Sequence, residues 1–263
     1  MPYLNLNLEK EFLGKKIIIT GASRGLGAML CKCLAERGAQ IAMLSRSKIE
    51  MENIKNELKN SSNHISIKVD LLKNSSVDLA FRKAKKFLKQ VDIIFHIAGG
   101  GFGLKDKLIT NEDLKKLFQV NLGAAIEINR LAIKYRNKNH FLKLIHVGSI
   151  ASYEAVASVG YNIVKSALAA YVRSLGRELY KNKVLVTGIM PGGFIAPGNA
   201  MERFKKKNLK EYKNFIKTRL PRGIMGSADE ILPILLFLCS NHSSMMGGCM
   251  VPIDGGEGKS YQI

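Results

Sequence analysis

Long hydrophobic runs are absent from this 263-residue sequence. The longest apolar stretch, residues 231–239, is far shorter than the ~20 residues that a membrane-spanning helix needs. We therefore expect a buried helix there and no membrane partner. Residues 1–16 lack the continuous apolar segment of a secretory signal, which favours a cytoplasmic location.

Cysteines are few and do not follow a known pattern. The four of them, Cys31, Cys33, Cys239 and Cys249, have a spacing that matches no zinc-binding or redox motif. We expect reduced, mostly buried thiols, as in cytoplasmic proteins, and no metal site.

Acidic residues are outnumbered: 41 lysines and arginines stand against 21 aspartates and glutamates, a formal net charge of +20. Such an excess of positive charge is typical of proteins that bind nucleic acids. However, the basic residues are scattered over surface segments such as 55–63 and 82–90, and no nucleic-acid-binding motif appears. We therefore do not expect nucleic acid to be a partner.

The length and the hydrophobic content of 46% fit one globular domain over residues 1–263. Apolar segments typical of strands alternate with segments of helical periodicity. The expected strands cover 15–20, 39–44, 65–69, a segment from 92 into the glycines at 99, 141–147 and 183–189, and a closing strand and turn are expected at 253–256. The expected helices cover 25–38, 49–59, 74–90, 111–134, 155–180 and 231–239. This alternation predicts an α/β fold with a doubly wound parallel sheet of the Rossmann type, with seven strands and helices on both faces.

A glycine-rich turn follows the first expected strand. Gly21, Gly25 and Gly27 have GxxxGxG spacing and lead into an amphipathic helix. Glycines let the backbone approach a pyrophosphate, which binds at the N-terminus of the helix, where amide groups are unpaired. A glycine-rich turn alone is weak evidence, but between a strand and a helix it predicts dinucleotide binding.

The end of the second expected strand, Ser45-Arg46, indicates which dinucleotide. No Asp or Glu stands there to bind a free ribose 2′-hydroxyl. Arg46 and Arg24 instead offer positive charge to a 2′-phosphate. This favours NADP(H) over NAD(H); the alternative is that Arg46 is a solvated turn residue.

Tyr161 and Lys165 lie four residues apart on an expected helix, so they share one face. A free phenol has a pKa of about 10, and a nearby positive charge lowers it. Lowering it by roughly three units takes about 4 kcal/mol, which Lys165 and a cationic cofactor ring can supply together. Ser149, at the end of a buried strand, is placed to hydrogen-bond a substrate oxygen. A Tyr and a Lys at this spacing also occur without function, and the upstream dinucleotide pattern favours catalysis.

Two more polar residues interrupt apolar segments. Asn121 lies within an apolar stretch of the 111–134 helix, so it needs polar partners inside the protein. His96 lies alone in a buried strand, and we interpret it as a satisfied core residue rather than a catalyst.

Taken together, these residues resemble the short-chain dehydrogenase/reductase family, in its compact single-domain form, over residues 12–256. The residues that carry the resemblance are Thr20, Gly21, Gly25, Gly27, Asp70, Ala98, Gly99, Asn121, Ser149, Tyr161, Lys165, Pro191, Gly192, Asp254, Gly255 and Gly256. The order and spacing of the whole set are far more specific than any one of them.

The resemblance implies four catalytic residues. Tyr161 would be the general acid or base on the substrate oxygen. Lys165 would lower the pKa of Tyr161 and hold the nicotinamide ribose. Ser149 would orient the substrate carbonyl, and Asn121 would hold a water molecule that links Lys165 to solvent.

The same resemblance implies a cofactor-binding set that runs through the whole chain. Its members are Gly21, Ser23, Arg24, Gly25, Leu26, Gly27, Ser45, Arg46, Asp70, Leu71, Ala98, Gly99, Tyr161, Lys165, Pro191, Gly192 and Phe194. Asp70 would contact the adenine, Ala98 and Gly99 would back the adenine-side ribose, and the segment after Gly192 would clamp the nicotinamide. Members of the family are commonly homodimers or homotetramers, packed through the helices that carry Asn121 and Tyr161.

Three features depart from the family pattern. His96 and Ile97 stand where two asparagines are usual, so that contact within the sheet must be rebuilt. Ala196 stands where a threonine usually contacts the cofactor. The glycine-rich run 99–103 is unusually long, which predicts a mobile loop beside the active site.

Residues 194–222 correspond to the segment that covers the substrate in the family, and here they are strongly basic. Such a lid would attract a phosphorylated sugar, a nucleotide-linked sugar or an acyl chain on an acidic carrier protein; the alternative is a solvated helix face. We therefore expect an NADP(H)-dependent oxidoreductase that interconverts a carbonyl and a secondary alcohol. Its small substrate would be a sugar derivative or a 3-oxoacyl thioester, and the basic lid would favour an anionic form. The alternative function is a catalytically silent dinucleotide-binding sensor or scaffold.

Overall fold

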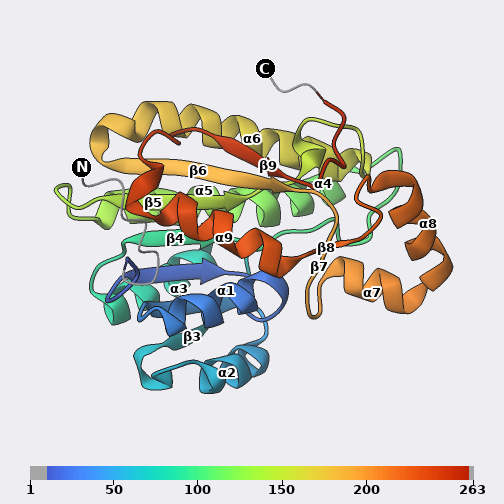
Figure 1. Ribbon diagram of the computed structural model, residues 1–263. Helices are drawn as coiled ribbons and strands as arrows, with labels where there is room; N and C mark the ends of the chain where they lie inside the picture. Colours follow the sequence, from blue (N-terminus) through green and yellow to red (C-terminus); the bar gives the residue numbers. More distant parts are fainter. Residues whose placement is uncertain (1–10, 261–263) are drawn as a thin grey trace.

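The computed structural model describes residues 11–260. Residues 1–10, part of the segment considered for a signal, lie outside the described residues. Seven strands form one parallel sheet in the order β3-β2-β1-β4-β5-β6-β9 (Figure 1). The strands of this sheet are β1 (Lys16–Thr20), β2 (Gln40–Ser45), β3 (Ile65–Lys68), β4 (Ile93–His96), β5 (Leu142–Val147), β6 (Val184–Pro191) and β9 (Met250–Ile253).

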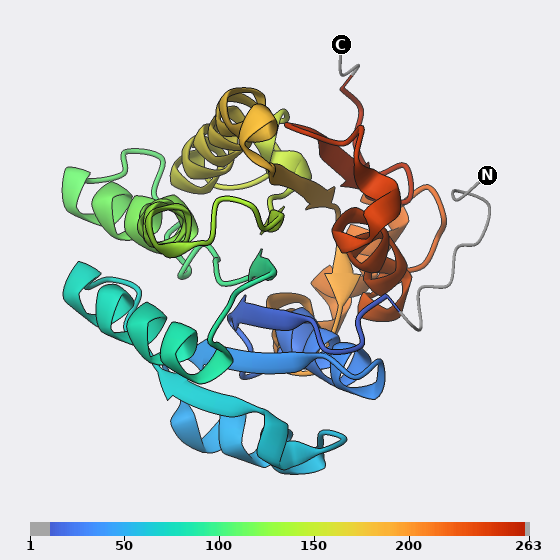
Figure 2. The ribbon, with the colours of Figure 1, turned by 90° about the vertical axis from the view of Figure 1, so that its left-hand side faces the viewer.

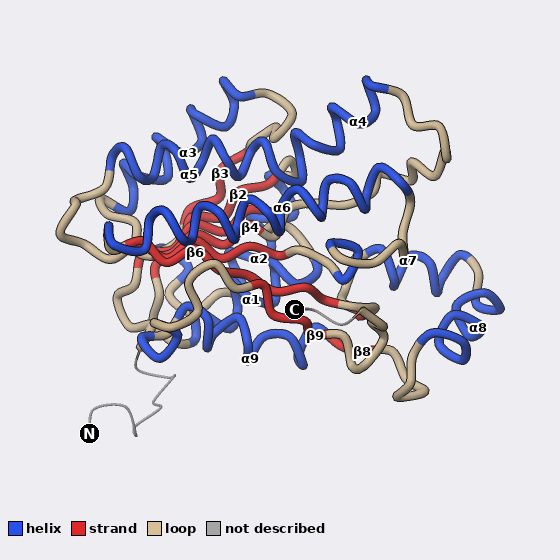
Figure 3. Tube along the Cα trace, turned by 90° about the horizontal axis from the view of Figure 1, so that it is seen from above, coloured by secondary structure: helices blue, strands red, loops and turns tan. Residues whose placement is uncertain are grey.

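Helices cover both faces of the sheet (Figures 2 and 3). The helices are α1 (Gly25–Glu36), α2 (Lys48–Glu57), α3 (Asn74–Leu88), α4 (Asn111–Phe118), α5 (Ala124–Tyr135), α6 (Val159–Leu179), α7 (Ala200–Lys207), α8 (Leu209–Arg219) and α9 (Ala228–Cys239). In Figure 3, α3, α5 and α6 lie on one side of the strands, and α1 and α9 lie on the other. The expected doubly wound fold with seven parallel strands is therefore confirmed.

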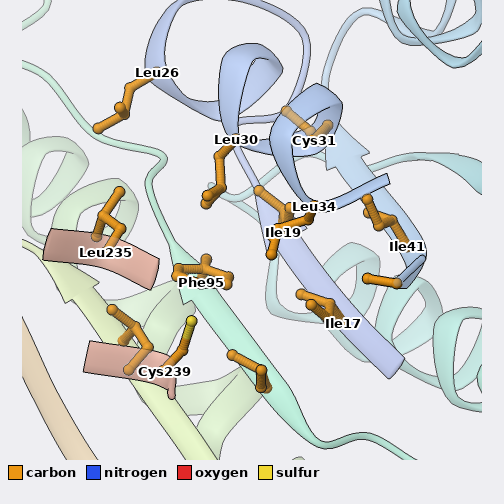
Figure 4. Close-up of a cluster of buried hydrophobic side chains, with 14 of the residues drawn as sticks. Ile17, Ile19, Leu26, Leu30, Cys31, Leu34, Ile41, Phe95, Leu235 and Cys239 are labelled. Atoms are coloured by element: carbon orange, nitrogen blue, oxygen red, sulfur yellow. The ribbon is translucent and has the colours of Figure 1, made fainter. Parts of the chain in front are cut away.

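Alternate residues of β1 show how the sheet is held between two cores. Ile17 and Ile19 pack with α1 and α9 (Figure 4), whereas Ile18 packs with α3, α5 and α6. Successive side chains of a strand point to opposite faces, so a strand covered on both faces must be apolar throughout. This is why the strands appear in the sequence as continuous apolar runs.

The helix expected over 111–134 is broken, which corrects the sequence prediction. A five-residue π-helical turn, Gln119–Gly123, separates α4 from α5. The amide of Asn121 donates to the Leu117 carbonyl at 2.9 Å, so a side chain takes up the backbone acceptor at this wide turn. Helical periodicity continues through the turn, which is why the sequence pattern does not show it.

Two other expected boundaries differ. The helix expected from 155 begins at Val159, because the amide of Asn162 holds the preceding residues in a loop: it accepts from Ala157 N at 3.2 Å and donates to Glu154 O at 2.9 Å. The closing strand begins earlier than expected, at Met250, and ends at Ile253, where the expected turn follows over 254–256. In addition, β7 (Phe194–Ile195) and β8 (Gly226–Ser227) form a small separate pair that was not predicted.

All four cysteines are free; Cys31 and Cys239 are buried, and Cys33 and Cys249 are partly exposed. No group of three or more metal-ligating side chains occurs in residues 11–260. Within the same range, none of the helices is both long and apolar enough to cross a membrane.

The helices α7 and α8 project beyond the sheet at the carboxyl end of β6 (Figures 1 and 3), and Arg219 anchors them. Its guanidinium pairs with the Glu257 carboxylate at 2.7 Å and donates to the Val156 carbonyl at 3.2 Å. The other oxygen of Glu257 accepts from Gly193 N at 2.5 Å. One buried carboxylate thus joins the end of α8 to the backbone that follows β6.

His96 ends β4, and His146 is its register partner in β5. Both are buried, and His96 Nε2 is hydrogen-bonded to the side-chain amide of Asn129, with 2.7 Å between Nε2 and Oδ1. This confirms His96 as a core residue and shows how the contact within the sheet is rebuilt. Burial lowers the pKa of His96 to about 4, and burial followed by repulsion from His96 and Lys165 lowers the pKa of His146 in the same direction.

The Glu257–Arg219 pair predicts an effect on stability. We expect Glu257→Gln to lower the free energy of unfolding by about 2 kcal/mol, because Arg219 keeps its charge in a largely enclosed site without its counter-charge. The side chains of Arg219 and Glu257 are only 32% and 3% exposed. The control Glu112→Gln, which removes a carboxylate that is 80% exposed, should cost less than about 0.5 kcal/mol in urea denaturation. Equal losses in the two variants would contradict this account.

The buried histidines predict acid sensitivity. The pKa of His96 is lower in the folded state than its value of 6.5 in the unfolded state. Above pH 6.5 the ring is neutral in both states, so its titration does not change the free energy of unfolding there. As pH falls from 6.5 toward 4, the unfolded state takes up the proton first, so His96 alone should reduce the unfolding free energy by about 3 kcal/mol. The free energy of unfolding, measured by urea denaturation at a series of pH values, should fall less with decreasing pH in His96→Asn than in the wild type. The same pH dependence in both proteins would refute the assignment.

Candidate active site

The candidate active site lies at the carboxyl end of the sheet, where the strand order reverses between β1 and β4. Ligands of open α/β sheets bind in the crevice at such a switch point. The chain brings the expected residues there from separate strands: Gly21 directly follows β1, Ser45 ends β2, Asp70 follows β3, Ala98 follows β4 and Pro191 ends β6.

The glycines after β1 permit backbones to pack closely. Gly21 has a φ of +73°, and a Cβ on it would lie 2.8 Å from Ala98 N. A Cβ on Gly27 would collide with the Gly21 carbonyl. These two positions therefore exclude a side chain for packing reasons, and they hold the start of α1 against the ends of β1 and β4.

The start of α1 fits the pyrophosphate of a dinucleotide. No side chain caps this helix, and its first turn contains no acidic residue. Unpaired amides at a helix N-terminus attract an anionic group. Gly25 N donates to Pro197 O at 2.8 Å, so the segment after β7 lies against the same turn. Leu26 points into the core with 4% exposure, which leaves only its backbone for a cofactor.

The ends of β1 and β2 meet through a hydrogen bond between serines, Ser45 Oγ to Ser23 Oγ at 2.8 Å. Next to them, Arg24 and Arg46 are exposed. Neither forms an ion pair with any residue of 11–260. The side chain of Arg24 runs toward the segment after β7, since a Cβ on Gly198 would lie 3.3 Å from Arg24 Cδ. Both guanidinium groups are exposed cations that an anionic group can approach.

Asp70 closes the turn after β3 by accepting from Leu72 N at 3.1 Å. The neighbouring Leu71 is buried, and its carbonyl accepts from Gln119 Nε2 at 3.0 Å. This bond joins the turn after β3 to the π-helical turn that carries Asn121.

The side chain of Asn121 holds the glycine-rich loop after β4. Its Oδ1 accepts from Gly100 N at 3.0 Å, and its Nδ2 donates to Gly100 O at 3.0 Å. A Cβ on Gly99 would lie 2.7 Å from Asn121 Oδ1 and 3.4 Å from Lys165 Nζ, so this backbone runs directly past both side chains. The amide of Asn121 is thus engaged with protein backbone, and its expected role in holding a water molecule stays a prediction.

Ser149, Tyr161 and Lys165 come together at the end of β5. Lys165 is 3% exposed, its Nζ lies 5.5 Å from the centre of the Tyr161 ring, and it donates to Val147 O at 3.0 Å. Ser149 begins a short 3₁₀ turn, where its Oγ accepts from Ala151 N at 3.2 Å. The shared helix face expected for Tyr161 and Lys165 is therefore present.

The charge states differ from the expectation that Lys165 lowers the pKa of Tyr161. Burial raises the pKa of Tyr161 to about 12, and only the contact with Ser149 acts in the opposite direction. Burial lowers the pKa of Lys165 to about 8. The reason is that Lys165 directs its ammonium at the Val147 carbonyl while desolvation dominates at both groups. At neutral pH the site therefore holds a protonated phenol beside a protonated amine.

The backbone after β6 is fixed by residues that the sequence did not single out. Gly192 N donates to Ile253 O at 3.1 Å, and a Cβ on Gly192 would lie 2.7 Å from Glu257 Oε2. Phe194 opens β7 and packs against the core. No sequence signal marks Glu257. Asn129, by contrast, is a buried polar residue in an apolar helix, the same signal that identified Asn121.

Comparisons with known proteins agree with this geometry. Residues 15–208 match the family model described as short chain dehydrogenase. The 3-oxoacyl-(acyl-carrier-protein) reductase FabG of Aquifex aeolicus is 25% identical over 255 residues, which cover 95% of this chain and 99% of that protein.

Two solved structures share the fold. L-sorbose reductase of Gluconobacter frateurii, complexed with NADPH and L-sorbose, has a TM-score of 0.86 at 22% identity and covers 96% of this chain and 100% of its own. The 3-ketoacyl-(acyl-carrier-protein) reductase of Brucella melitensis, complexed with NADH, has a TM-score of 0.81 at 23% identity over 94% of this chain and 100% of its own. Since the family model covers most of the chain, the protein belongs to the short chain dehydrogenase family and is an NAD(P)-dependent dehydrogenase or reductase.

Proposed function

We propose that the protein interconverts a carbonyl and a secondary alcohol with NADP(H), and that Tyr161 is the general acid or base. The observation that carries this proposal is the buried Lys165 ammonium, 5.5 Å from the Tyr161 ring and on the same helix face. A phenol with a cation beside it, at the switch point of a dinucleotide-type sheet, is suited to proton transfer at a carbonyl oxygen.

Each of these residues has a separate role in the proposed reaction. A nicotinamide cofactor, when bound, would supply the hydride to the substrate carbon in reduction or accept it in oxidation. The Ser149 hydroxyl hydrogen-bonds the substrate oxygen and orients the carbonyl. The Tyr161 hydroxyl donates its proton to that oxygen in the reductive direction, and the Lys165 ammonium stabilises the phenolate that remains. Asn121 keeps the glycine-rich loop in place and holds the water molecule through which the proton is replaced.

For the cofactor, we propose that the residues after each strand act together. The glycine-rich turn, with Ser23 and Leu26 through their backbones, holds the pyrophosphate at the start of α1. Arg24 and Arg46 bind the 2′-phosphate. The remaining contacts come from Ser45, Asp70, Leu71, Ala98, Gly99, Tyr161, Lys165, Pro191, Gly192 and Phe194.

For the substrate, we propose that residues 194–222 cover it and favour an anionic compound. The outer faces of α7 and α8 carry exposed cations opposed only by Glu202 and Glu211; they are Arg203, Lys205, Lys206, Lys207, Lys210, Lys213 and Lys217. A field of this sign raises the local concentration of anionic ligands. Sugar derivatives and 3-oxoacyl thioesters, which the names of the similar proteins suggest, both have suitable anionic forms.

We further propose a cytoplasmic homo-oligomer. The four free thiols suit a reducing compartment. Phe118, Val159 and Ile163 are 42%, 46% and 45% exposed at the helices that carry the catalytic residues, and a second copy of the chain would bury them.

The first test of the function is Tyr161→Phe. With NADPH and a panel of ketones, keto sugars and 3-oxoacyl thioesters, the variant should lose 10²- to 10⁴-fold in kcat, roughly the contribution of general acid catalysis, while it still binds NADPH. The control Tyr180→Phe, at the far end of α6, should keep full activity. Normal turnover in Tyr161→Phe would refute the mechanism, and tight NADPH binding by an inactive wild type would favour a silent sensor or scaffold.

The second test concerns the choice of cofactor. Arg46→Gln should weaken NADPH binding by roughly 10- to 100-fold and leave NADH binding nearly unchanged, because only the former loses a charge-assisted contact. Fluorescence titration of both nucleotides measures the ratio. Arg177→Gln, which removes an exposed arginine on α6, is the matched control. An unchanged ratio in Arg46→Gln would leave Arg46 as a solvated turn residue.

A further inference from the structure

A small cavity lies behind the candidate active site, on the face of the sheet covered by α5 and α6. Its volume is about 10 Å³, close to the minimum that a single water molecule requires. Its lining includes His96 and His146 together with Thr20, Ala98 and Asn121. Polar residues from three strands, β1, β4 and β5, and from the π-helical turn therefore surround a space of the size of one water molecule.

The amide of Asn129 determines which ring nitrogens carry protons. His96 Nε2 lies 2.7 Å from Asn129 Oδ1, and His146 Nε2 lies 3.3 Å from Asn129 Nδ2. Nδ2 also donates to the Tyr171 hydroxyl at 3.1 Å. An amide offers an acceptor on one side and donors on the other, so one histidine must donate to it and the other must accept. This conclusion holds whichever way the amide is turned, and the two neutral rings therefore take opposite tautomers.

Opposite tautomers leave one donor and one acceptor at the two Nδ1 atoms. Neither Nδ1 has a hydrogen-bond partner within residues 11–260. His96 is 6% exposed and His146 is fully buried, with ring centroids 4.5 Å apart. Buried polar atoms are almost always hydrogen-bonded to protein or to ordered water. The cavity is thus lined by two rings that need opposite kinds of partner.

We propose that the cavity is an internal hydration site, in which one water molecule accepts from the Nδ1–H of one histidine and donates to Nδ1 of the other. The water completes a neutral hydrogen-bond chain from Tyr171 through Asn129 to both histidines. This chain joins the ends of β4 and β5 to α5 and α6. The strand residue after His146 is Val147, whose carbonyl binds Lys165, so the hydration site supports the position of that amine.

Neutral rings suit their surroundings. The titratable groups that face the two rings are Tyr171 and Lys165, both from α6. A protonated Lys165 opposes a second positive charge on His146, and Tyr171 offers no negative charge at neutral pH. The hydration site is independent of the proposed reaction, because it requires neither a cofactor nor a substrate.

The test is a long-range ¹H–¹⁵N correlation spectrum of the uniformly ¹⁵N-labelled protein at pH 7.5, with no ligand added. His64 is an internal control, because its Nδ1 accepts from Ile41 N and its Nε2 contacts Lys59 O, which fixes the Nε2–H tautomer. We expect one of His96 and His146 to show the same pattern as His64 and the other to show the Nδ1–H pattern. Identical tautomers, or a cationic pattern in either ring, would overturn the proposal. His96→Gln assigns the signals, and backbone resonance assignment serves if that variant does not fold.

A crystal structure at high resolution gives the second readout. Density for one water molecule within about 3 Å of both Nδ1 atoms is the expected result. A dry cavity, or a water molecule bound to only one ring, would overturn the hydration site even if the enzyme proves active on carbonyl compounds. Conversely, failure of the Tyr161→Phe test would leave this result untouched, so the two proposals can fail separately.

Discussion

The ammonium of Lys165 is almost removed from water, and its neighbours must supply the hydrogen bonds that solvent would otherwise provide. The Val147 carbonyl accepts one at 3.0 Å, which ties α6 to the end of β5 directly before Ser149. Because Tyr161 lies one turn earlier on α6, the same bond also fixes the phenol relative to the serine. Gly176 permits this arrangement further along the helix, since a Cβ there would lie 2.5 Å from Gly248 Cα. The relative positions of the three polar groups therefore depend on how closely α6 can pack against the sheet.

A second constraint is the lack of space where β1, β4 and α5 meet. Gly21 leaves no room for a side chain against Ala98, and Gly99 leaves none between Asn121 and Lys165. The backbone after β4 therefore runs past Asn121 and Lys165 at van der Waals distance, and Asn121 holds it there with two hydrogen bonds to Gly100. The broken helix is a consequence of this contact, since the amide of Asn121 also takes the Leu117 carbonyl at the π-helical turn. The α-helical geometry between α4 and α5 is thus interrupted at the residue that fixes the loop after β4 at the switch point.

Short-range patterns explain what the sequence could predict. The strands, the shared face of Tyr161 and Lys165 and the strand–glycine–helix context each depend on residues within a few positions of one another. The pairing of Glu257 with Arg219 and the His96–Asn129–His146 chain join residues 17 to 38 positions apart, so no local pattern reveals them. The π-helical turn lies within one unbroken periodic segment, which hides it in the same way. Within the protein alone, burial raises the pKa of Tyr161, and the lowering expected from Lys165 together with a cationic cofactor ring stays a prediction. Sequence spacing brings a cation near the phenol, but only the packed structure shows that desolvation is the larger effect.

The basic helices α7 and α8 are attached to the site rather than merely adjacent to it. Arg219 reaches the loop before α6 through Val156 and the backbone after β6 through Glu257 and Gly193. A displacement of α8 must therefore either break the buried ion pair or carry both segments with it. The helices that carry the exposed lysines are thus joined, through the single carboxylate of Glu257, to the backbone that follows β6.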